Sequence, residues 1–180
     1  MNRWFKNAFI AALSVLLAGG AIAADMRVSL PQRAALIIPL PVGWRGHVRR
    51  AVPDLPPTVI LSSITEKNFE IMLTPVWPLS ADAKPPTPDF LRAMVAAGAQ
   101  RAKAQAVEAD LPVRELSGQG LFGAYFSATD KAPKPGEYRN MTQGMVAVGE
   151  LQIGFTVLSN GDAASVNGPA IQMLQSLRRE

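Results

Sequence analysis

The 180-residue chain contains no cysteine and only one histidine, His47. Without cysteine the protein has no disulfide, no thiolate metal site, no cysteine nucleophile and no thiol for a lipid anchor. A metal site built from several histidines is also excluded, and a catalytic triad would have to use His47 as its base. No Gly-x-Ser-x-Gly motif occurs. We therefore expect no catalytic residue, no metal and no cofactor.

Long apolar runs are also scarce. The run at residues 8–17 follows Arg3 and Lys6 and precedes Ala21-Ile22-Ala23, which together match a secretory signal with a small-residue cleavage site. A membrane-spanning helix needs about 20 apolar residues, and this run is shorter. We expect residues 1–23 to be removed as a signal peptide.

The remaining residues 24–180 have the size of one domain. Loss of the two basic residues of the signal lowers the formal net charge from +4 to +2, which is too small to indicate nucleic-acid binding. The sequence thus predicts a periplasmic or secreted single domain without a stable membrane anchor. Its oligomeric state is left open.

Three consecutive strands are predicted between residues 118 and 160, at 122–129, 138–148 and 151–157. Apolar residues alternate with polar or small ones in the last of these, which is typical of a strand with one buried face. Only Gly149 and Glu150 separate the second and third strands. Glycine at the first position of a two-residue turn favours a type II′ hairpin, because that turn requires a positive φ there.

The N-terminal half predicts shorter elements. Residues 26–30 and 35–40 are expected to be edge strands, because prolines mark their ends. A long surface loop is expected at residues 41–57, followed by a hairpin of residues 58–64 and 68–74. The proline-rich residues 75–88 are expected to cross over to the next element.

Two helices are predicted. Thr87 should cap a helix that extends to about Glu108, with Pro88 at its favoured first position. A second helical stretch begins at Gly161, although Gly168-Pro169 indicates that its regular part starts only at Pro169. Within these helices we expect Met94, Val95 and Met173 to lie in the core. Arg178 and Arg179 are expected at the C-terminal end of the last helix, where cations suit the helix dipole. The pattern as a whole predicts an α+β fold with a largely antiparallel β-sheet flanked by helices.

Three segments resemble the PsbP-like superfamily, which includes small periplasmic DcrB-like proteins. They are Leu40-Pro41-Val42-Gly43-Trp44, the segment Tyr125-Phe126-Ser127-Ala128-Thr129-Asp130, and the hairpin from Gln143-Gly144 to Leu158. The resemblance implies an α-β-α sandwich that serves as a binding or assembly module. It implies no shared catalytic constellation, so no family active site is carried over.

Two patterns could suggest other chemistry. Gly118-x-Gly120-x-x-Gly123 spells a dinucleotide-binding pattern, but that site needs a helix after the last glycine, and the alternation here predicts a strand. Glu66 with Glu70, or Asp130 with Glu137, could form an acid/base pair, yet nothing in the sequence places either pair together.

The segment at residues 44–50 is the strongest candidate for a binding site. It contains Trp44, Arg45, His47, Arg49 and Arg50, with no acidic residue before Asp54. Arginine and tryptophan are enriched where interfaces concentrate their energy. The alternative, which we favour on the sequence alone, is that Trp44 closes a sheet edge and the arginines are solvated.

The sequence therefore predicts an exported, non-catalytic binding or assembly module. Its partner would be an envelope protein or an anionic surface, not a nucleic acid. The alternatives are a small-ligand carrier, in which helices and sheet enclose an apolar cleft, and a hydrolase.

Overall fold

The computed structural model describes residues 22–30, 34–49, 56–76 and 84–180. The predicted signal segment falls almost wholly outside these residues, as does Arg50. The elements are β1 (Ile22–Val28), β2 (Leu36–Pro41), β3 (Trp44–Arg49), β4 (Thr58–Ser63), β5 (Phe69–Val76), α1 (Pro88–Ala102), the 3₁₀ helix η1 (Lys103–Gln105), β6 (Arg114–Gly118), β7 (Leu121–Thr129), β8 (Asn140–Val148), β9 (Leu151–Ser159), α2 (Ala163–Gln175) and β10 (Arg178–Arg179).

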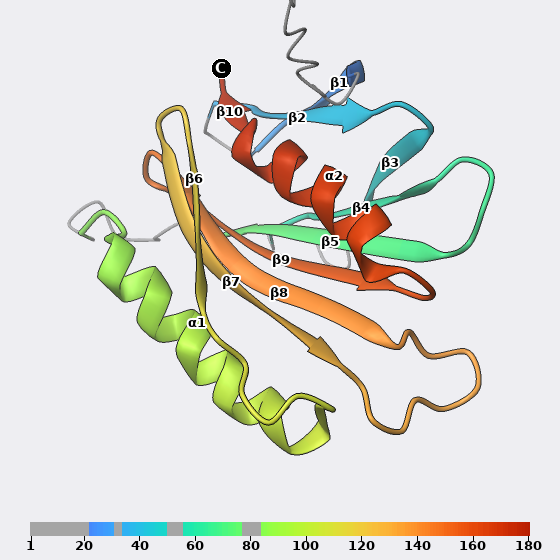
Figure 1. The fold of residues 1–180 in the computed structure, drawn as a ribbon. Coiled ribbons are helices and arrows are strands. Elements are labelled where there is room, and N and C mark those ends of the chain that lie inside the picture. Colours follow the sequence, from blue (N-terminus) through green and yellow to red (C-terminus); the bar gives the residue numbers. More distant parts are fainter. Residues whose placement is uncertain (1–21, 31–33, 50–55, 77–83) are drawn as a thin grey trace, which may run out of the picture.

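A seven-stranded antiparallel sheet forms the centre of the molecule, in the order β3-β4-β5-β9-β8-β7-β6. A second, three-stranded antiparallel sheet has the order β1-β2-β10. Helices α1 and α2 lie on opposite sides of the large sheet (Figure 1). The predicted α+β class, with an antiparallel sheet flanked by helices in a single domain, is confirmed.

The side of the large sheet that carries α2 and the small sheet is named the closed face. Alternate residues of the strands point into it, so that Leu151, Ile153, Phe155 and Val157 of β9 are all buried. From α2 it receives Val166, Ala170, Met173 and Leu174, and from β2 it receives Leu36, Ile38 and Leu40. This cluster is the main hydrophobic core.

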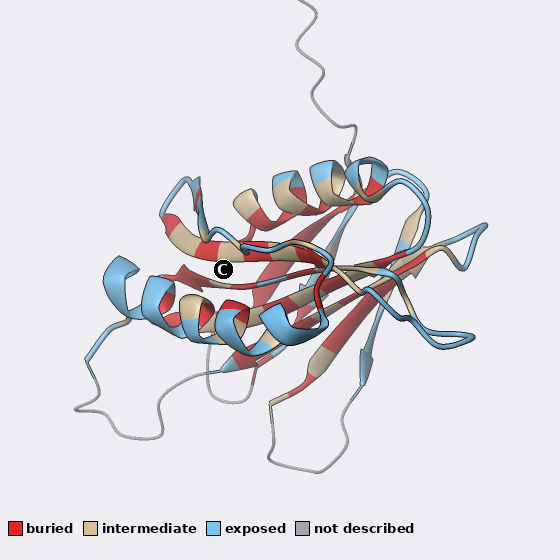
Figure 2. Ribbon diagram, turned by 60° about the horizontal axis from the view of Figure 1, so that its bottom comes forward, coloured by how far each residue is buried: buried red, intermediate tan, exposed pale blue. Residues whose placement is uncertain are grey.

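The opposite side, which carries α1, is named the open face. Helix α1 packs mainly on β7 and β8, with Val95 and Ala99 against Ala124, Phe126 and Ala128. Figure 2 shows the buried stripe of α1 turned to the sheet and its remaining surface exposed. The strands beyond β8 are not packed against α1.

The predicted hairpin between β8 and β9 is confirmed. Val148 pairs with Leu151, and Gly149 has a φ of 61°, which is the conformation that glycine adopts without strain. The predicted strand after Gly123 is also confirmed, because β7 runs on to Thr129 with no helix at this position. The geometry required for a dinucleotide is therefore absent from this segment.

Two expectations for the N-terminal half are wrong. Residues 44–49 form strand β3, paired along their whole length with β4, within the segment predicted to be a surface loop. In addition, β2 is the central strand of the small sheet rather than an edge. Its Pro39 is tolerated because β10 pairs only with Leu36 and Ile37, so the side of β2 next to Pro39 needs no donor.

The predicted start of α1 is confirmed, since the Thr87 side chain accepts a hydrogen bond from the amide of Phe90 at 3.2 Å. The helix ends earlier than predicted, at Ala102, and one turn of 3₁₀ helix follows. Helix α2 starts earlier than predicted, at Ala163, because the Asp162 side chain caps it, and Pro169 lies inside it.

The C-terminal arginines were predicted to lie at the end of α2 but form β10. Arg178 makes an ion pair with Asp25 of β1, and Arg179 makes one with Glu150 at 3.4 Å. These contacts fasten the end of the chain to both sheets.

A candidate binding surface on the open face

Residues that lie side by side across the sheet define the open face. Because directly opposed residues in antiparallel strands point to the same side, one row can be followed from β3 to β7. It contains His47, Ile60, Met72, Thr156, Gln143 and Phe126. Helix α1 covers the Phe126 end of this row. Beyond it His47 is exposed and Met72 and Thr156 are half-buried, whereas Ile60 is buried.

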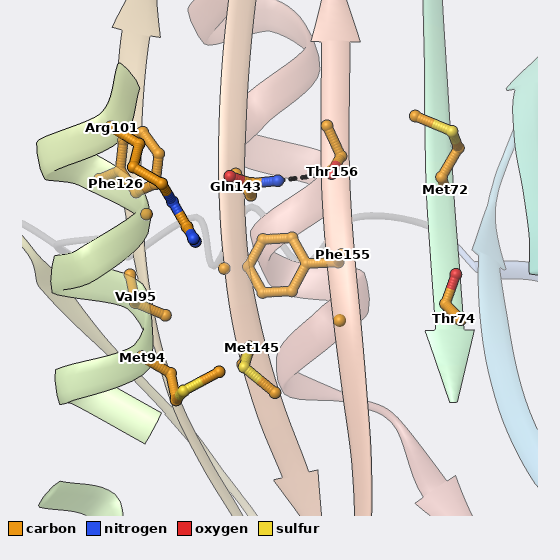
Figure 3. Close-up of a pocket in the computed structure, with 13 residues that line it drawn as sticks. Met72, Thr74, Met94, Val95, Arg101, Phe126, Gln143, Met145, Phe155 and Thr156 are labelled. Carbon is orange, nitrogen blue, oxygen red and sulfur yellow. Dashed lines mark hydrogen bonds between the residues drawn. The ribbon is translucent and has the colours of Figure 1, made fainter. Parts of the chain in front are cut away.

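A hollow of about 350 Å³ lies where the edge of α1 meets the uncovered strands. Figure 3 shows Met94 and Val95 of α1 facing Met145 of β8, with Met72 and Thr74 of β5 on the far side. Gly154 forms part of the floor, and a Cβ added there would meet nothing closer than 3.9 Å. Methionine side chains are flexible and polarizable, which suits a surface that adapts to a partner.

Polar groups are few in this hollow. The Gln143 amide donates to the Thr156 hydroxyl at 3.5 Å, and Arg101 extends from α1 toward β8 (Figure 3). Arg101 makes no ion pair with any residue that the structure describes. The hollow therefore combines an apolar lining with one unpaired guanidinium group at its rim.

A second hollow, of about 640 Å³, continues along the same flank of α1 toward the β7–β8 connection. Its apolar lining comes from Ala102, Ala106, Ala128, Met141 and Leu158, and Tyr138 adds a phenol. Burial, together with the carboxylate of Glu70, raises the pKa of Tyr138. The two hollows together are named the trough.

The structure brings one of the candidate carboxylate pairs into the same place. Asp130 and Glu137 both line the larger hollow, but each carboxylate is engaged by the loop between β7 and β8. Asp130 accepts from the amide of Ala132 at 2.8 Å, and Glu137 accepts from the amide of Lys134 at 2.9 Å. The other candidate pair is Glu66 with Glu70. Glu66 accepts a hydrogen bond from the Asn68 side chain in the β4–β5 turn, and Glu70 lies on β5.

At the far edge of the open face, Arg45, His47 and Arg49 project from alternate positions of β3. All three are exposed. They lie on the open face because Arg45 donates to the Ser62 hydroxyl at 3.4 Å and His47 lies opposite Ile60. None of the three makes an ion pair within the described part of the chain. These residues are named the basic row.

Trp44 differs from the other candidate residues. It is half-buried and turns toward the closed face, where its ring contacts that of Phe69 in a tilted arrangement, with a centroid distance of 4.6 Å and an interplanar angle of 45°. The structure therefore unites Arg45, His47 and Arg49 on one surface and separates Trp44 from them.

The trough was missed by the sequence analysis. Val95 and Met173 are buried in the core as predicted, but Met94 is 47% exposed and lines the trough. The available signal was the polar side of the strands, where Thr74, Gln143 and Thr156 alternate with buried residues. That pattern shows that one face of the sheet is less buried. It does not show which part of that face a short helix leaves uncovered.

The described residues contain no group of three or more His, Asp or Glu side chains arranged to hold a metal ion. Within the same part of the chain, no helix has the length and apolar character required to cross a bilayer.

Comparison with known proteins supports the fold. The solution structure of cyanobacterial PsbP (CyanoP) from Synechocystis sp. PCC 6803 aligns with a TM-score of 0.51 at 12% sequence identity, over 90% of this chain and 96% of that one. A crystal structure from Bacteroides thetaiotaomicron VPI-5482 aligns with a TM-score of 0.48 at 8% identity, over 81% of this chain, which spans 45% of that chain's length. No family model and no curated protein sequence matches. The fold is thus PsbP-like, and the likeness concerns the fold alone.

Proposed function

We propose that the protein is an exported, non-catalytic binding module that recognises an acidic region of a partner protein through the basic row. The single observation that carries this proposal is the position of Arg45, His47 and Arg49. They are exposed, they share one face of an edge strand, and no acidic side chain of the described residues neutralises them.

The chemistry of the row fits such a partner. Guanidinium groups bind carboxylates in a bidentate manner, and exposed charges at an interface act mainly on the association rate and its salt dependence. Glu70 lies in the same row as Arg45, two strands away, so their backbones are about 9 to 10 Å apart. The two side chains form no ion pair. This leaves the basic row free for an external acid.

Export is supported by the N-terminal sequence, in which Arg3 and Lys6 precede an apolar run and Ala21-Ile22-Ala23. Exported material should therefore begin at Ala24, as read by N-terminal sequencing.

The basic row is tested by charge reversal. A double variant, Arg45→Glu with Arg49→Glu, should slow capture of the partner from an envelope extract by about tenfold or more at low salt, with the difference shrinking as salt is added. The control is Arg92→Glu with Arg114→Glu, which changes the net charge equally on exposed residues of α1 and β6. Equal capture by both double variants, each shown to be folded by circular dichroism, would contradict the proposal.

The trough favours a second candidate, a carrier of small apolar ligands. Its larger hollow, at about 640 Å³, lies within the size range of ligand pockets and is lined mainly by apolar side chains. Native mass spectrometry of the purified mature chain separates the two candidates, since a retained apolar molecule is expected of a carrier and not of a protein-binding module.

A further inference from the structure

We propose that β3 accepts an extended segment of the partner as an additional strand, in which acidic side chains alternate with small apolar ones. This inference rests on the proposed function and specifies how the basic row is used. The acidic side chains would lie on the open face beside Arg45, His47 and Arg49.

The outer edge of β3 provides the backbone groups for such pairing. β3 is the terminal strand in the sheet order, so no described strand pairs with its outer side. The carbonyl of Gly43 accepts from the amide of Ile64 at 2.8 Å, which fixes the alternation of the ladder. The backbone groups of residues 45, 47 and 49 therefore point to β4, and those of residues 44, 46 and 48 point outward.

The open-face side of β3 sets the charge of the added strand. Neighbouring side chains on one face of a strand are about 6.6 to 6.8 Å apart, and this spacing is shared by any strand paired with β3. Acidic residues at alternate positions of the added strand would therefore lie directly beside the basic row, where opposite charges on paired strands are favourable.

The opposite side of β3 determines which side chains fit at the alternate positions of the added strand. Val48 points to that side and is 38% exposed. It borders a hollow of about 360 Å³ that is also lined by Arg27, Val28 and Ser29, where β1 approaches β3. Small apolar side chains of the added strand would enter this hollow.

Two alternative pairings are disfavoured by the same observations. A second copy of the chain joined through β3 would place two basic rows side by side, and like charges on paired strands are destabilising. The other edge strand, β6, carries both signs of charge in Arg114 and Glu115. Its Gly118 is also approached by the backbone of Gln175, with a Cβ position only 2.1 Å from that carbonyl oxygen.

The test removes one outward-facing donor. Val48→Pro deletes the amide that an added strand needs, at an edge position of the kind where proline is tolerated. Val48→Ala removes side-chain contacts but keeps the amide, and is the matched control. The probes are a capped peptide of about seven residues in which glutamate alternates with valine, and a peptide of the same composition with the glutamates consecutive.

Wild type and Val48→Ala should bind the alternating peptide, and the amides of Gly46 and Val48 should then exchange more slowly with solvent. Val48→Pro should bind the alternating peptide at least about tenfold more weakly than wild type does. Wild type should bind the consecutive peptide at least about tenfold more weakly than the alternating one. Equal binding by the two Val48 variants, equal binding of the two peptides, or no binding of the alternating peptide would overturn strand addition.

The envelope capture assay distinguishes this failure from a failure of the proposed function. If Val48→Pro captures the partner as well as Val48→Ala while Arg45→Glu with Arg49→Glu does not, the basic row binds without strand addition and only the further inference is lost. If the double variant captures normally, the proposed function itself is lost.

Discussion

The two faces of the large sheet are built from the same strands but differ in how far other elements cover them. The closed face is covered by α2 and the three-stranded sheet except at β3, where Val48 is exposed, and its inward residues, such as Ile153 and Leu174, are fully buried. The open face receives one short helix over β7 and β8. Many of its remaining residues, such as Met72, Thr74 and Thr156, are half-exposed, although Ile60 is buried. The main hydrophobic core therefore lies on the closed face, and the open face keeps more of its side chains in contact with solvent.

The largest expected difference between the faces concerns bulky side chains. Phe155→Ala removes a fully buried ring from the closed face and should lower the free energy of unfolding by about 3 to 5 kcal/mol. Met94→Ala removes a half-exposed side chain from the trough and should change it by less than about 0.5 kcal/mol. Urea unfolding of both variants measures the difference. Similar losses would show that the trough is part of the core and not a free surface.

Replacing a glycine by alanine on each face compares the packing of the two faces with the same chemical change. Gly144 and Gly154 lie on neighbouring strands but would direct a Cβ to opposite faces. At Gly144 the Cβ would lie 2.3 Å from the carbonyl oxygen of Ala124 and 2.6 Å from the ring of Phe155, so Gly144→Ala should destabilise by about 1 to 3 kcal/mol or more. At Gly154 the nearest atom is 3.9 Å away.

Gly154→Ala should therefore be neutral or stabilise by up to about 1 kcal/mol, because alanine restricts the unfolded chain. Thermal unfolding of the two variants is sufficient to compare them. A destabilised Gly154→Ala variant would mean that the floor of the trough is packed.

The sequence predicted the elements whose signals are local. Alternation identified β7, β8 and β9, the two-residue turn at Gly149 fixed one pairing, and Thr87 marked the start of α1. Strand β3 was missed because prolines flank it and Gly46 with charged neighbours interrupts any alternation. It is a strand because β4 pairs with it and because Gly46 lets Met26 of β1 approach closely. Such long-range contacts leave no local signal.

The candidate site was predicted in part for the same reason. Charge clustering at Arg45, His47 and Arg49 is visible in the sequence, but that all three share a face follows only once the segment is a strand. The trough depends on the length of α1 and on the strand order, which places β9 and β5 beyond its reach. Neither property can be deduced from periodicity alone.

The smallest expected effect concerns the anchor of α1 on the open face. Glu108, just beyond η1, accepts hydrogen bonds from the amide of Thr129 at 2.9 Å and from its hydroxyl at 2.8 Å. Burial alone would raise the pKa of Glu108, but these hydrogen bonds outweigh burial, so its pKa is lowered from the ordinary value of 4.5. A carboxyl with a lower pKa in the folded state stabilises the fold above the unfolded-state pKa and loses that contribution as the pH falls through the folded-state value.

Glu108→Gln should therefore lower the free energy of unfolding by about 1 kcal/mol at pH 7, and by less as the pH falls below about 4.5. The matched control is Asp110→Asn, which removes a fully exposed carboxylate paired with Lys103 at 2.8 Å and should have almost no effect at either pH. Urea unfolding at pH 7 and pH 3.5 measures both variants. If the free energies of unfolding of wild type and Glu108→Gln differed equally at the two pH values, the ionised carboxylate would not be what holds α1 to the end of β7. The packing of Val95 and Ala99 on Phe126 would then account for the position of the helix.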